Sequence, residues 1–539
     1  MILISFLVAC SEITTTNNTT QQTTSAYITS EEDTMSSQTN LDTTTNLTTT
    51  QFPSGITSIS TAETTTFLTT VTTVSTEITS CETKGIENCR YSLSEALSNG
   101  LFEEAETYED LSDAQVILRE RTNPNLVVLD QDDTVVAMKY GAVNFRTKSI
   151  SETTTLGHTG FRYPTYLNGH YNVDGVYLDS VGVIVYGMIA GVRFEVVNSE
   201  IELIPDIHLK NAYSYYEVVD GELVHRISYQ LSSADFQSIG AIDIAPDYLE
   251  EGVRYYSYDN HYFFTDFIVM TDDLRNNTYE HAINSDSPYY NYYQYLSFRS
   301  QTNYTADELN AYISSNVGTS SALYDSGEDF INAQDSVYIN GAMELAFAIH
   351  ESGWGSSRIA KDKNNLFGIN AYDSDPYNSA TTFETVQDCI EYHVQYFLGM
   401  RYFNPKYYVG FGTNFGNKYQ GMNYKYASDA YWGEKIAKHY YNLDKALGFK
   451  DRNSYQIALL HPDALGYYSP NLDSPVVYNP STYTYRGLWI PFPIMKEKDE
   501  FYVLRLPLGL NDNYEMDINE IMGPTDVFYV LKEHVIIIN

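Results

Sequence analysis

The chain has 539 residues, of which 43% are hydrophobic, so it is long enough for several packed domains and too long for a single core. Its formal net charge of -39 disfavours nucleic acid as a partner, because phosphate binding requires clustered Lys and Arg. A neutral or cationic target suits such a charge better. The four Cys, at positions 10, 81, 89 and 389, provide neither a CxxC metal pair nor a disulfide framework.

The N-terminus carries a short apolar run, MILISFLVAC, followed by a polar segment. The run resembles the end of a bacterial lipoprotein signal in which Cys10 becomes lipidated; an ordinary secretory signal is the alternative, and the usual basic residues are missing. No later segment offers the about 18 unbroken apolar residues of a membrane helix. We expect 1–10 to be a signal remnant and the protein to be extracellular, at the cell surface or membrane-anchored through Cys10, in a bacterium.

Residues 11–84 are dominated by Thr and Ser, as in TTTNNTTQQTT. Such a composition cannot bury enough apolar area to offset chain entropy, so we expect a disordered linker or stalk. Cys81 and Cys89 lie at its edge, where they either close a small loop or remain independent thiols.

Residues 85–208 are predicted to form one or more β-rich modules. SLSEALSNGLFEEAETYEDL, at 92–111, is interpreted as a short helical segment. NLVVLDQDDTVVAMKYGAVNFR, at 125–146, alternates like two paired strands with a turn at 130–133. The connecting region 209–289 mixes further strand signals with many Tyr.

Residues 290–450 are predicted to be mainly helical. Thr305 and Glu308 have the spacing of a capping box that starts a helix. An apolar face then runs from Ile339 to Ile349 and ends at Glu351. The tail, 455–539, returns to short strands with polar turns, which indicates a small barrel similar to a bacterial SH3-type module. It would be a cell-wall binder or a structural cap on the preceding domain.

Glu351 ends this helical pattern, just before Gly353, Trp354 and Gly355. The negative end of the helix dipole disfavours the carboxylate there, and an apolar setting beside Trp354 would raise its pKa further. Both effects favour a protonated acid near neutral pH, as a general acid for glycosidic cleavage requires. The structural alternative is the polar end of a helix.

Two sequence blocks decide between these interpretations. HESGWGSSRIAKDKNNLFGINAYDSDPY, at 350–377, and GMNYKYASDAYWGEKIA, at 421–437, resemble the bacterial endo-β-N-acetylglucosaminidases of glycoside hydrolase family 73, the autolysin type related to mannosyl-glycoprotein endo-β-N-acetylglucosaminidase. The resemblance covers 290–450 and implies a lysozyme-like, mainly α (α+β) catalytic domain. It implies Glu351 as the general acid.

The second catalytic group stays open. Asp373 is the best-placed carboxylate after the NLFG segment, and Asp375 and Glu384 are weaker candidates. Tyr426 and Asp429 of YASD form another polar pair, in which Asp429 could instead cap the following helix. Without a facing carboxylate, the substrate N-acetyl carbonyl could attack, or a distant Asp could activate water.

Amides and aromatic rings near these blocks are candidates for sugar binding. Turn chemistry and buried packing are their structural alternatives. The candidate binding residues are Trp354, Asn364, Asn365, Phe367, Tyr372, Tyr431 and Trp432. The tyrosines of 289–295 either extend the groove or pack in the interior.

No cofactor or metal is expected. His350 and Glu351 lack the second His of a zinc motif, because Trp354 occupies that position. Cys389 and His393 fit an apolar helix face better than a thiol hydrolase. We expect a cell-wall hydrolase that acts on peptidoglycan glycan strands. A muramidase or lytic transglycosylase on the same fold, or a non-catalytic wall-binding protein, is the alternative.

Overall fold

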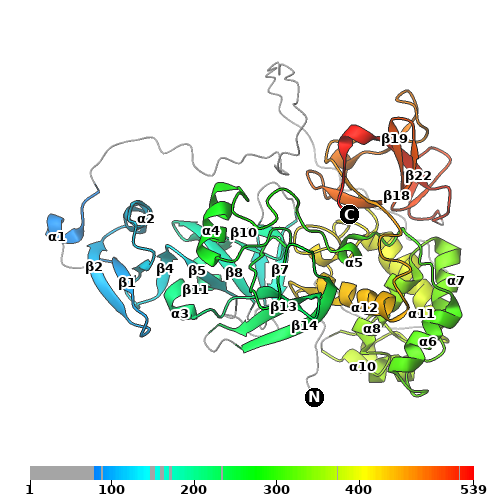
Figure 1. Ribbon diagram of the computed structural model, residues 1–539, viewed down its shortest axis with the longest axis horizontal. Helices are drawn as coiled ribbons and strands as arrows, with labels where there is room; N and C mark the ends of the chain where they lie inside the picture. Colours follow the sequence, from blue (N-terminus) through cyan, green and yellow to red (C-terminus); the bar gives the residue numbers. More distant parts are fainter. Residues whose placement is uncertain are drawn as a thin grey trace, which may run out of the picture. The chain divides into compact units, whose positions relative to one another are not determined.

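The computed structural model describes residues 78–85, 89–145, 152–157, 163–168, 173–231, 235–372, 374–520 and 522–539 (Figure 1). The predicted signal at 1–10, Cys10 and most of the predicted linker 11–84 lie outside these ranges. Within them, no helix is both long and apolar enough to cross a membrane.

The first described part is a sheet with the strand order β2-β1-β3-β4, against which α2 (Leu111–Glu120) packs. Its strands are β1 (Tyr91–Ala96), β2 (Phe102–Tyr108), β3 (Leu126–Leu129) and β4 (Val135–Met138). The helix predicted over 92–111 is therefore wrong: β1 and β2 form a hairpin. Gly100 takes a φ of 87° in its turn, and an Asn-Gly pair favours such turns over a helix. The predicted turn between β3 and β4 is confirmed. Cys81 and Cys89 form a disulfide, and Cys81–Lys84 form the short helix α1. The predicted disordered linker 11–84 is therefore wrong for its last four residues.

Two further sheets follow. One has the order β10-β9-β8-β5-β11, and the other is the antiparallel meander β12-β13-β14. A separate hairpin joins β6 (Thr153–Leu156) to β7 (Thr165–Asn168). The strands of the two sheets are β5 (Gly141–Asn144), β8 (Asp174–Val181), β9 (Ile184–Ile189), β10 (Val192–Val197), β11 (Glu202–Pro205), β12 (Tyr215–Val219), β13 (Glu222–Gln230) and β14 (Asp235–Ile244). The short α3 (Asp206–Leu209) and α4 (Phe267–Asn276) complete this part.

The middle of the chain is mainly helical, as predicted. Its helices are α5 (Tyr292–Tyr295), α6 (Ala306–Asn316), α7 (Gly327–Val337), α8 (Gly341–Ser352), α9 (Arg358–Lys363), α10 (Pro376–Ser379), α11 (Val386–Tyr392), which continues as a π-helix over His393–Tyr402, and α12 (Trp432–Ala446). The capping box of Thr305 and Glu308 starts α6, which confirms that prediction.

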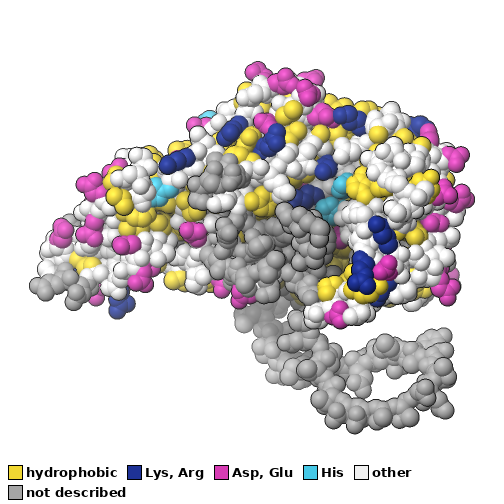
Figure 2. Space-filling view, turned by 90° about the horizontal axis from the view of Figure 1, so that it is seen from below, with side chains coloured by type: hydrophobic (Ala, Val, Ile, Leu, Met, Phe, Trp, Pro, Cys, Tyr) yellow, Lys and Arg dark blue, Asp and Glu magenta, His cyan; other side chains and the backbone are white. Residues whose placement is uncertain are grey.

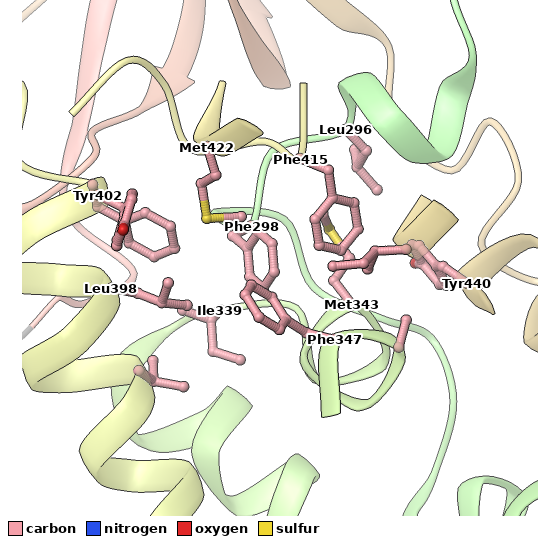
Figure 3. Packing of buried hydrophobic residues seen from close by; sticks show 14 of the residues in the cluster. Leu296, Phe298, Ile339, Met343, Phe347, Leu398, Tyr402, Phe415, Met422 and Tyr440 are labelled. Carbon is pink, nitrogen blue, oxygen red and sulfur yellow. The ribbon is translucent and has the colours of Figure 1, made fainter. Parts of the chain in front are cut away.

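Helix α8 runs through the core of this helical region. Its residues from Gly341 to Ile349 are buried all round, including Phe347, which lies among aromatic rings such as Phe298 and Phe415 (Figure 3). A helix that is apolar on every face belongs inside a protein. Burial on this scale fixes the position of the helix end, where Glu351 lies.

The C-terminal strands pair in the order β17-β16-β22-β19-β18-β15-β23. They are β15 (Ile457–Leu460), β16 (Gly466–Tyr467), β17 (Val476–Tyr478), β18 (Ile490–Lys498), β19 (Phe501–Arg505), β22 (Val527–Leu531) and β23 (Val535–Ile537), with a small hairpin of β20 (Gly509–Leu510) and β21 (Met516–Asp517). Fully buried Arg299 donates 2.8 Å to the carbonyl oxygen of Leu506 and 2.9 Å to that of Val337. This side chain thus ties the sheet to the helical region.

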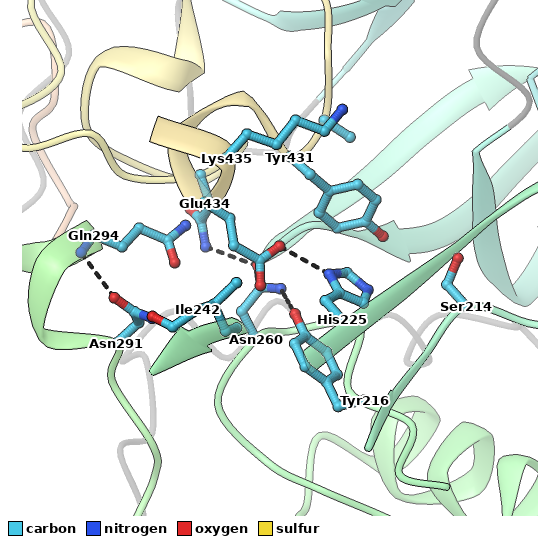
Figure 4. A network of polar contacts seen from close by, with 12 residues as sticks. Ser214, Tyr216, His225, Ile242, Asn260, Asn291, Gln294, Tyr431, Glu434 and Lys435 are labelled. Carbon is cyan, nitrogen blue, oxygen red and sulfur yellow. Dashed lines mark hydrogen bonds and ion pairs between the residues drawn. The ribbon is translucent and has the colours of Figure 1, made fainter. Parts of the chain in front are cut away.

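The β-rich part also contacts the helical region through buried polar groups. His225 Nδ1 of β13 lies 2.8 Å from Glu434 Oε2 in the first turn of α12, and both side chains are buried (Figure 4). Tyr431 packs among hydrophobic residues of the β-rich part. Helix α12 is therefore part of both cores.

Candidate active site

Glu351 lies in the last turn of α8. Asn340 caps the start of the helix by accepting a hydrogen bond from the Met343 backbone. The helix ends at Ser352, and Gly353, Trp354 and Gly355 then take φ angles of 57°, 61° and 64°, all left-handed. Left-handed residues end helices in this way. The carboxyl of Glu351 therefore lies at the negative end of the helix dipole, as predicted.

Gly355 holds the chain after this helix end against the loop at 321–323. A Cβ at Gly355 would approach Ser321 Oγ to 2.6 Å and the Leu323 backbone nitrogen to 2.7 Å. The Ser321 hydroxyl also donates 2.7 Å to the Trp354 carbonyl oxygen. The position requires glycine for both its φ angle and its space.

The carboxyl of Glu351 is half-buried and is held by an indole. Trp432 Nε1 donates a 3.0 Å hydrogen bond to Glu351 Oε1. Burial raises the pKa of Glu351 to about 8, although the Trp432 hydrogen bond opposes this rise. The predicted rise in the pKa of Glu351 is confirmed, but the indole at its carboxyl is that of Trp432 and not that of Trp354. Trp354 instead lies 5.7 Å from Tyr312 and 6.3 Å from His439, measured between ring centroids.

Trp432 was a candidate for stacking on a sugar ring, and the structure corrects this. Its side chain is fully buried, and Tyr426 covers it with a stacked ring whose centroid is 4.4 Å away. The ring of Trp432 has no face open to a ligand. Burial and the nearby Glu351 charge raise the pKa of Tyr426 well above its usual value, so its hydroxyl stays neutral.

Asp429 precedes α12 and is paired with Lys435. Its Oδ2 lies 2.5 Å from Lys435 Nζ, and its Oδ1 accepts from the Tyr431 backbone at 3.0 Å. Burial raises the pKa of Asp429, but the attraction and hydrogen bond of Lys435 outweigh it and leave the pKa below its usual value. Asp429 is therefore ionised at neutral pH, whereas Glu351 is largely protonated.

Three predicted binding residues have structural contacts. Asn364 Nδ2 donates to the carbonyl oxygens of Phe383 and Glu384. Asn365 is buried and bonded to the backbone of Ile369, which is the predicted turn chemistry. Phe367 is buried and stacks on His393 with a centroid distance of 3.7 Å. Asn365 and Phe367 were predicted to bind sugar. Because both side chains are buried and engaged within the protein, they support the fold around the site instead.

The other candidates differ in exposure. Tyr431 is 4% exposed and packs edge-on against His225, so it too is corrected to packing. Tyr372 is 46% exposed and Trp354 is half-buried, so these two rings can meet a ligand. Asp373 lies outside the described residues. Tyr292, Tyr293 and Tyr295 are buried, which favours packing over an extended groove.

Sequence reasoning missed a buried acid on the same helix. Glu344 Oε1, in α8, lies 2.6 Å from His393 Nδ1, and neither side chain is exposed. The spacing of Glu344 and Glu351, two helical turns, could have indicated it. Burial raises the pKa of neighbouring Cys389 to about 12, which argues against a reactive thiol there.

Glu351 is a half-buried and largely protonated acid that the Trp432 indole holds, which are the properties of a general acid for glycosidic cleavage. Residues 327–445 match the family model Glucosaminidase, described as mannosyl-glycoprotein endo-beta-N-acetylglucosaminidase. The predicted family resemblance is thereby confirmed for this segment.

Curated relatives agree with this match. Two Streptococcus pneumoniae proteins, from a serotype 4 strain and from strain R6, are named as candidate endo-beta-N-acetylglucosaminidases. Each is 45% identical over 151 residues, which is 28% of this chain and 22% or 20% of theirs. The chain thus matches about a fifth of the length of these relatives.

Two solved structures are each similar to 29% of the chain. The Major Bifunctional Autolysin is 25% identical, with 29% of this chain and 68% of that one covered and a TM-score of 0.23. Autolysin E of S. aureus is 23% identical, with 29% and 72% covered and a TM-score of 0.21. The family relationship rests on the sequence matches, not on these scores.

Proposed function

We propose that the protein is a cell-wall hydrolase that cleaves β-1,4 bonds after N-acetylglucosamine in peptidoglycan. The observation that carries the proposal is the carboxyl of Glu351, which burial keeps protonated to about pH 8 and which Trp432 orients. The family match over 327–445 supports the choice of bond. In this proposal the lysozyme-like fold covers 290–450.

The hydrogen bond of Trp432 decides which oxygen of Glu351 delivers the proton. Oε1 accepts from the indole, so in the neutral acid the proton resides on Oε2. Oε2 would protonate the leaving glycosidic oxygen as its bond to the sugar breaks. The carboxylate that forms keeps the Trp432 hydrogen bond, which limits the penalty for developing charge.

The remaining roles extend this proposal. Both oxygens of Asp429 are engaged by Lys435 and by the Tyr431 backbone, which suits a charge that stabilises an oxocarbenium-like transition state better than a nucleophile. The neutral hydroxyl of Tyr426 would contact the N-acetyl group. Asp373 is the candidate that would activate water. Trp354, Tyr372 and the side chain of Asn364 would contact sugars.

Mass spectrometry of digested muropeptides tests the reaction. Reducing-end N-acetylglucosamine supports the proposal. Reducing-end muramic acid would indicate a muramidase, and anhydro-muramic products would indicate a lytic transglycosylase. Intact glycan strands after digestion, with wall binding retained, would indicate a non-catalytic wall-binding protein.

The flanking regions complete the proposal. We infer an SH3-like barrel at 455–539 that binds the wall, and an exported protein with lipid at Cys10. Metabolic labelling with a fatty acid tests the anchor: a Cys10→Ala variant should lose the label, and a label that persists would contradict it.

A further inference from the structure

Basic groups gather beside the proposed general acid, although the chain as a whole carries a charge of -39. Lys435, Lys438 and His439 lie on successive turns of α12, and His350 precedes Glu351 on α8. Figure 2 shows a face on which a few Lys, Arg and His side chains lie close together to the right of the centre, while other Lys and Arg side chains are scattered. A local positive region in an acidic protein needs a reason.

The two lysines have different surroundings. Lys435 is compensated, because its ammonium lies 2.5 Å from Asp429 Oδ2 and 3.2 Å from the Tyr229 hydroxyl. Lys438 is half-buried, and within the described ranges its ammonium has no hydrogen bond and no ion pair. Its charge therefore remains available to a ligand.

Gly240 of β14 packs against the side chain of Lys438. A Cβ at Gly240 would lie 3.6 Å from Lys438 Cδ and 3.7 Å from Nζ, and Gly240 has a φ of 97°. The side chain of Lys438 thus lies across bare backbone of the β-rich part. Gly240 belongs to a part of the chain that lies before the family match, and Lys438 lies close enough to His350 and His439 to lower the pKa of both.

Two imidazoles adjoin Lys438. The rings of His350 and His439 are 5.7 Å apart, and His439 lies 6.3 Å from Trp354. Burial lowers the pKa of His350 to about 4; the charge of Lys435 adds to this shift and that of Asp429 opposes it. The pKa of His439 is also lowered, mainly by burial and further by the nearby His350 and Lys438. Both are neutral hydrogen-bonding groups at pH 7, so Lys438 is the charge that an anion would meet.

We propose that Lys438 and His439 form an anion subsite next to His350 and Trp354 that holds a carboxylate of the glycan strand. This proposal rests on the proposed function. N-acetylglucosamine is neutral, whereas muramic acid carries a lactyl carboxyl, free or extended by an acidic peptide. The subsite would therefore select peptidoglycan over neutral glycans of N-acetylglucosamine alone. A phosphate group is also an anion that such a subsite could bind. The experiment below distinguishes a phosphate ligand from a carboxylate ligand.

The test is calorimetric binding to the full-length Glu351→Gln protein. The ligands are a peptide-free peptidoglycan tetrasaccharide with lactyl carboxylates and the same compound with its carboxyls converted to methylamides. The acid is expected to bind about tenfold more tightly, as one charged hydrogen bond implies. Adding Lys438→Gln should abolish that preference, and Lys438→Arg should retain it. Lys445→Gln, which removes the same charge from the same helix at a residue paired with Glu222, should also retain it.

Equal affinity for the acid and the methylamide would overturn the proposal, as would a preference that survives Lys438→Gln. Inorganic phosphate that displaces the acid ligand at lower concentration than acetate does would overturn the carboxylate assignment. Muropeptide digestion by the wild-type protein is measured separately. Failed digestion counts against the proposed function, whereas normal digestion with equal affinities counts against the subsite alone.

Discussion

The indole of Trp432 donates a 3.0 Å hydrogen bond to the carboxyl of Glu351, a residue 81 positions earlier in the chain. The two side chains come from the two sequence blocks that carry the family resemblance. Their contact joins the end of α8 to the start of α12. The two blocks therefore meet at the carboxyl that we propose as the general acid.

Replacing Glu351 by Gln should lower kcat on peptidoglycan by about 10³-fold, because the general acid is lost while its shape remains. Substrate binding should persist. The measurement is release of reducing ends from purified walls. Glu328→Gln, at an exposed position of α7, is the control and should match wild type. Wall clearance by Glu351→Gln at the wild-type rate would remove Glu351 from the mechanism.

The value of kcat/KM should fall as pH rises through about 8, because the protonated form of Glu351 is the active one and burial raises its pKa to about 8. Trp432→Phe removes the hydrogen bond that opposes the rise, so the alkaline limb should move to higher pH. The same change should lower kcat by about tenfold or more through misorientation. An alkaline limb that stays in place would contradict the role of Trp432.

Thermal stability should respond to pH through Glu351. Its pKa is about 8 in the folded protein and about 4.3 in an unfolded chain, so the folded state binds the extra proton between these values. Stability from this group is present below about pH 4.3 and is lost as pH rises toward 8. Glu351→Gln carries no such loss. Its melting temperature should equal that of wild type at pH 4 and exceed it at pH 8; a constant difference would contradict the raised pKa.

The buried pair His225 and Glu434 makes the β-rich part and α12 depend on each other. Glu434→Ala leaves the imidazole buried without its partner, which should lower the free energy of unfolding by about 3–5 kcal/mol. Replacing both, His225→Phe with Glu434→Leu, should restore much of the loss. Urea unfolding followed by tryptophan fluorescence measures both. An unchanged midpoint for Glu434→Ala would show that the two parts fold independently.

Gly355 and Gly353 form a matched pair for testing the helix end. Gly355→Ala combines a left-handed φ with contacts of 2.6 and 2.7 Å to the loop at 321–323, and we expect a loss of about 2–4 kcal/mol. Gly353→Ala has the same kind of φ, but its nearest contact is 3.5 Å, so about 1 kcal/mol is expected. Equal losses from chemical denaturation would contradict the close-approach argument.

The sequence predicted those elements whose local pattern and tertiary setting agree. The apolar run before Glu351 became α8, and Thr305 with Glu308 capped α6. The helix predicted at 92–111 was wrong. The Leu, Ala and Glu residues of this segment are typical of helices, but Asn99 and Gly100 favour the turn of a hairpin.

At the site, the position of Glu351 was predictable and its partner was not. Trp432 has the flat ring of a sugar-binding residue, and only its burial under Tyr426 shows that it serves the acid instead. The type of a residue limits the interactions that its side chain can make. Exposure, which depends on distant segments, decides what it does. The packing of β14 against Lys438 is another such long-range contact that no local pattern contains.

Arg299 limits how such a chain could have been assembled by recombination. Its guanidinium is fully buried and donates to the carbonyl oxygens of Leu506 and Val337. A crossover near 450 that brought in an unrelated C-terminal segment would remove the Leu506 acceptor and leave this buried cation with the Val337 acceptor on the helical side. The C-terminal sheet is therefore expected to be inherited together with the helical region, and a viable chimera would have to carry a change at Arg299 as well.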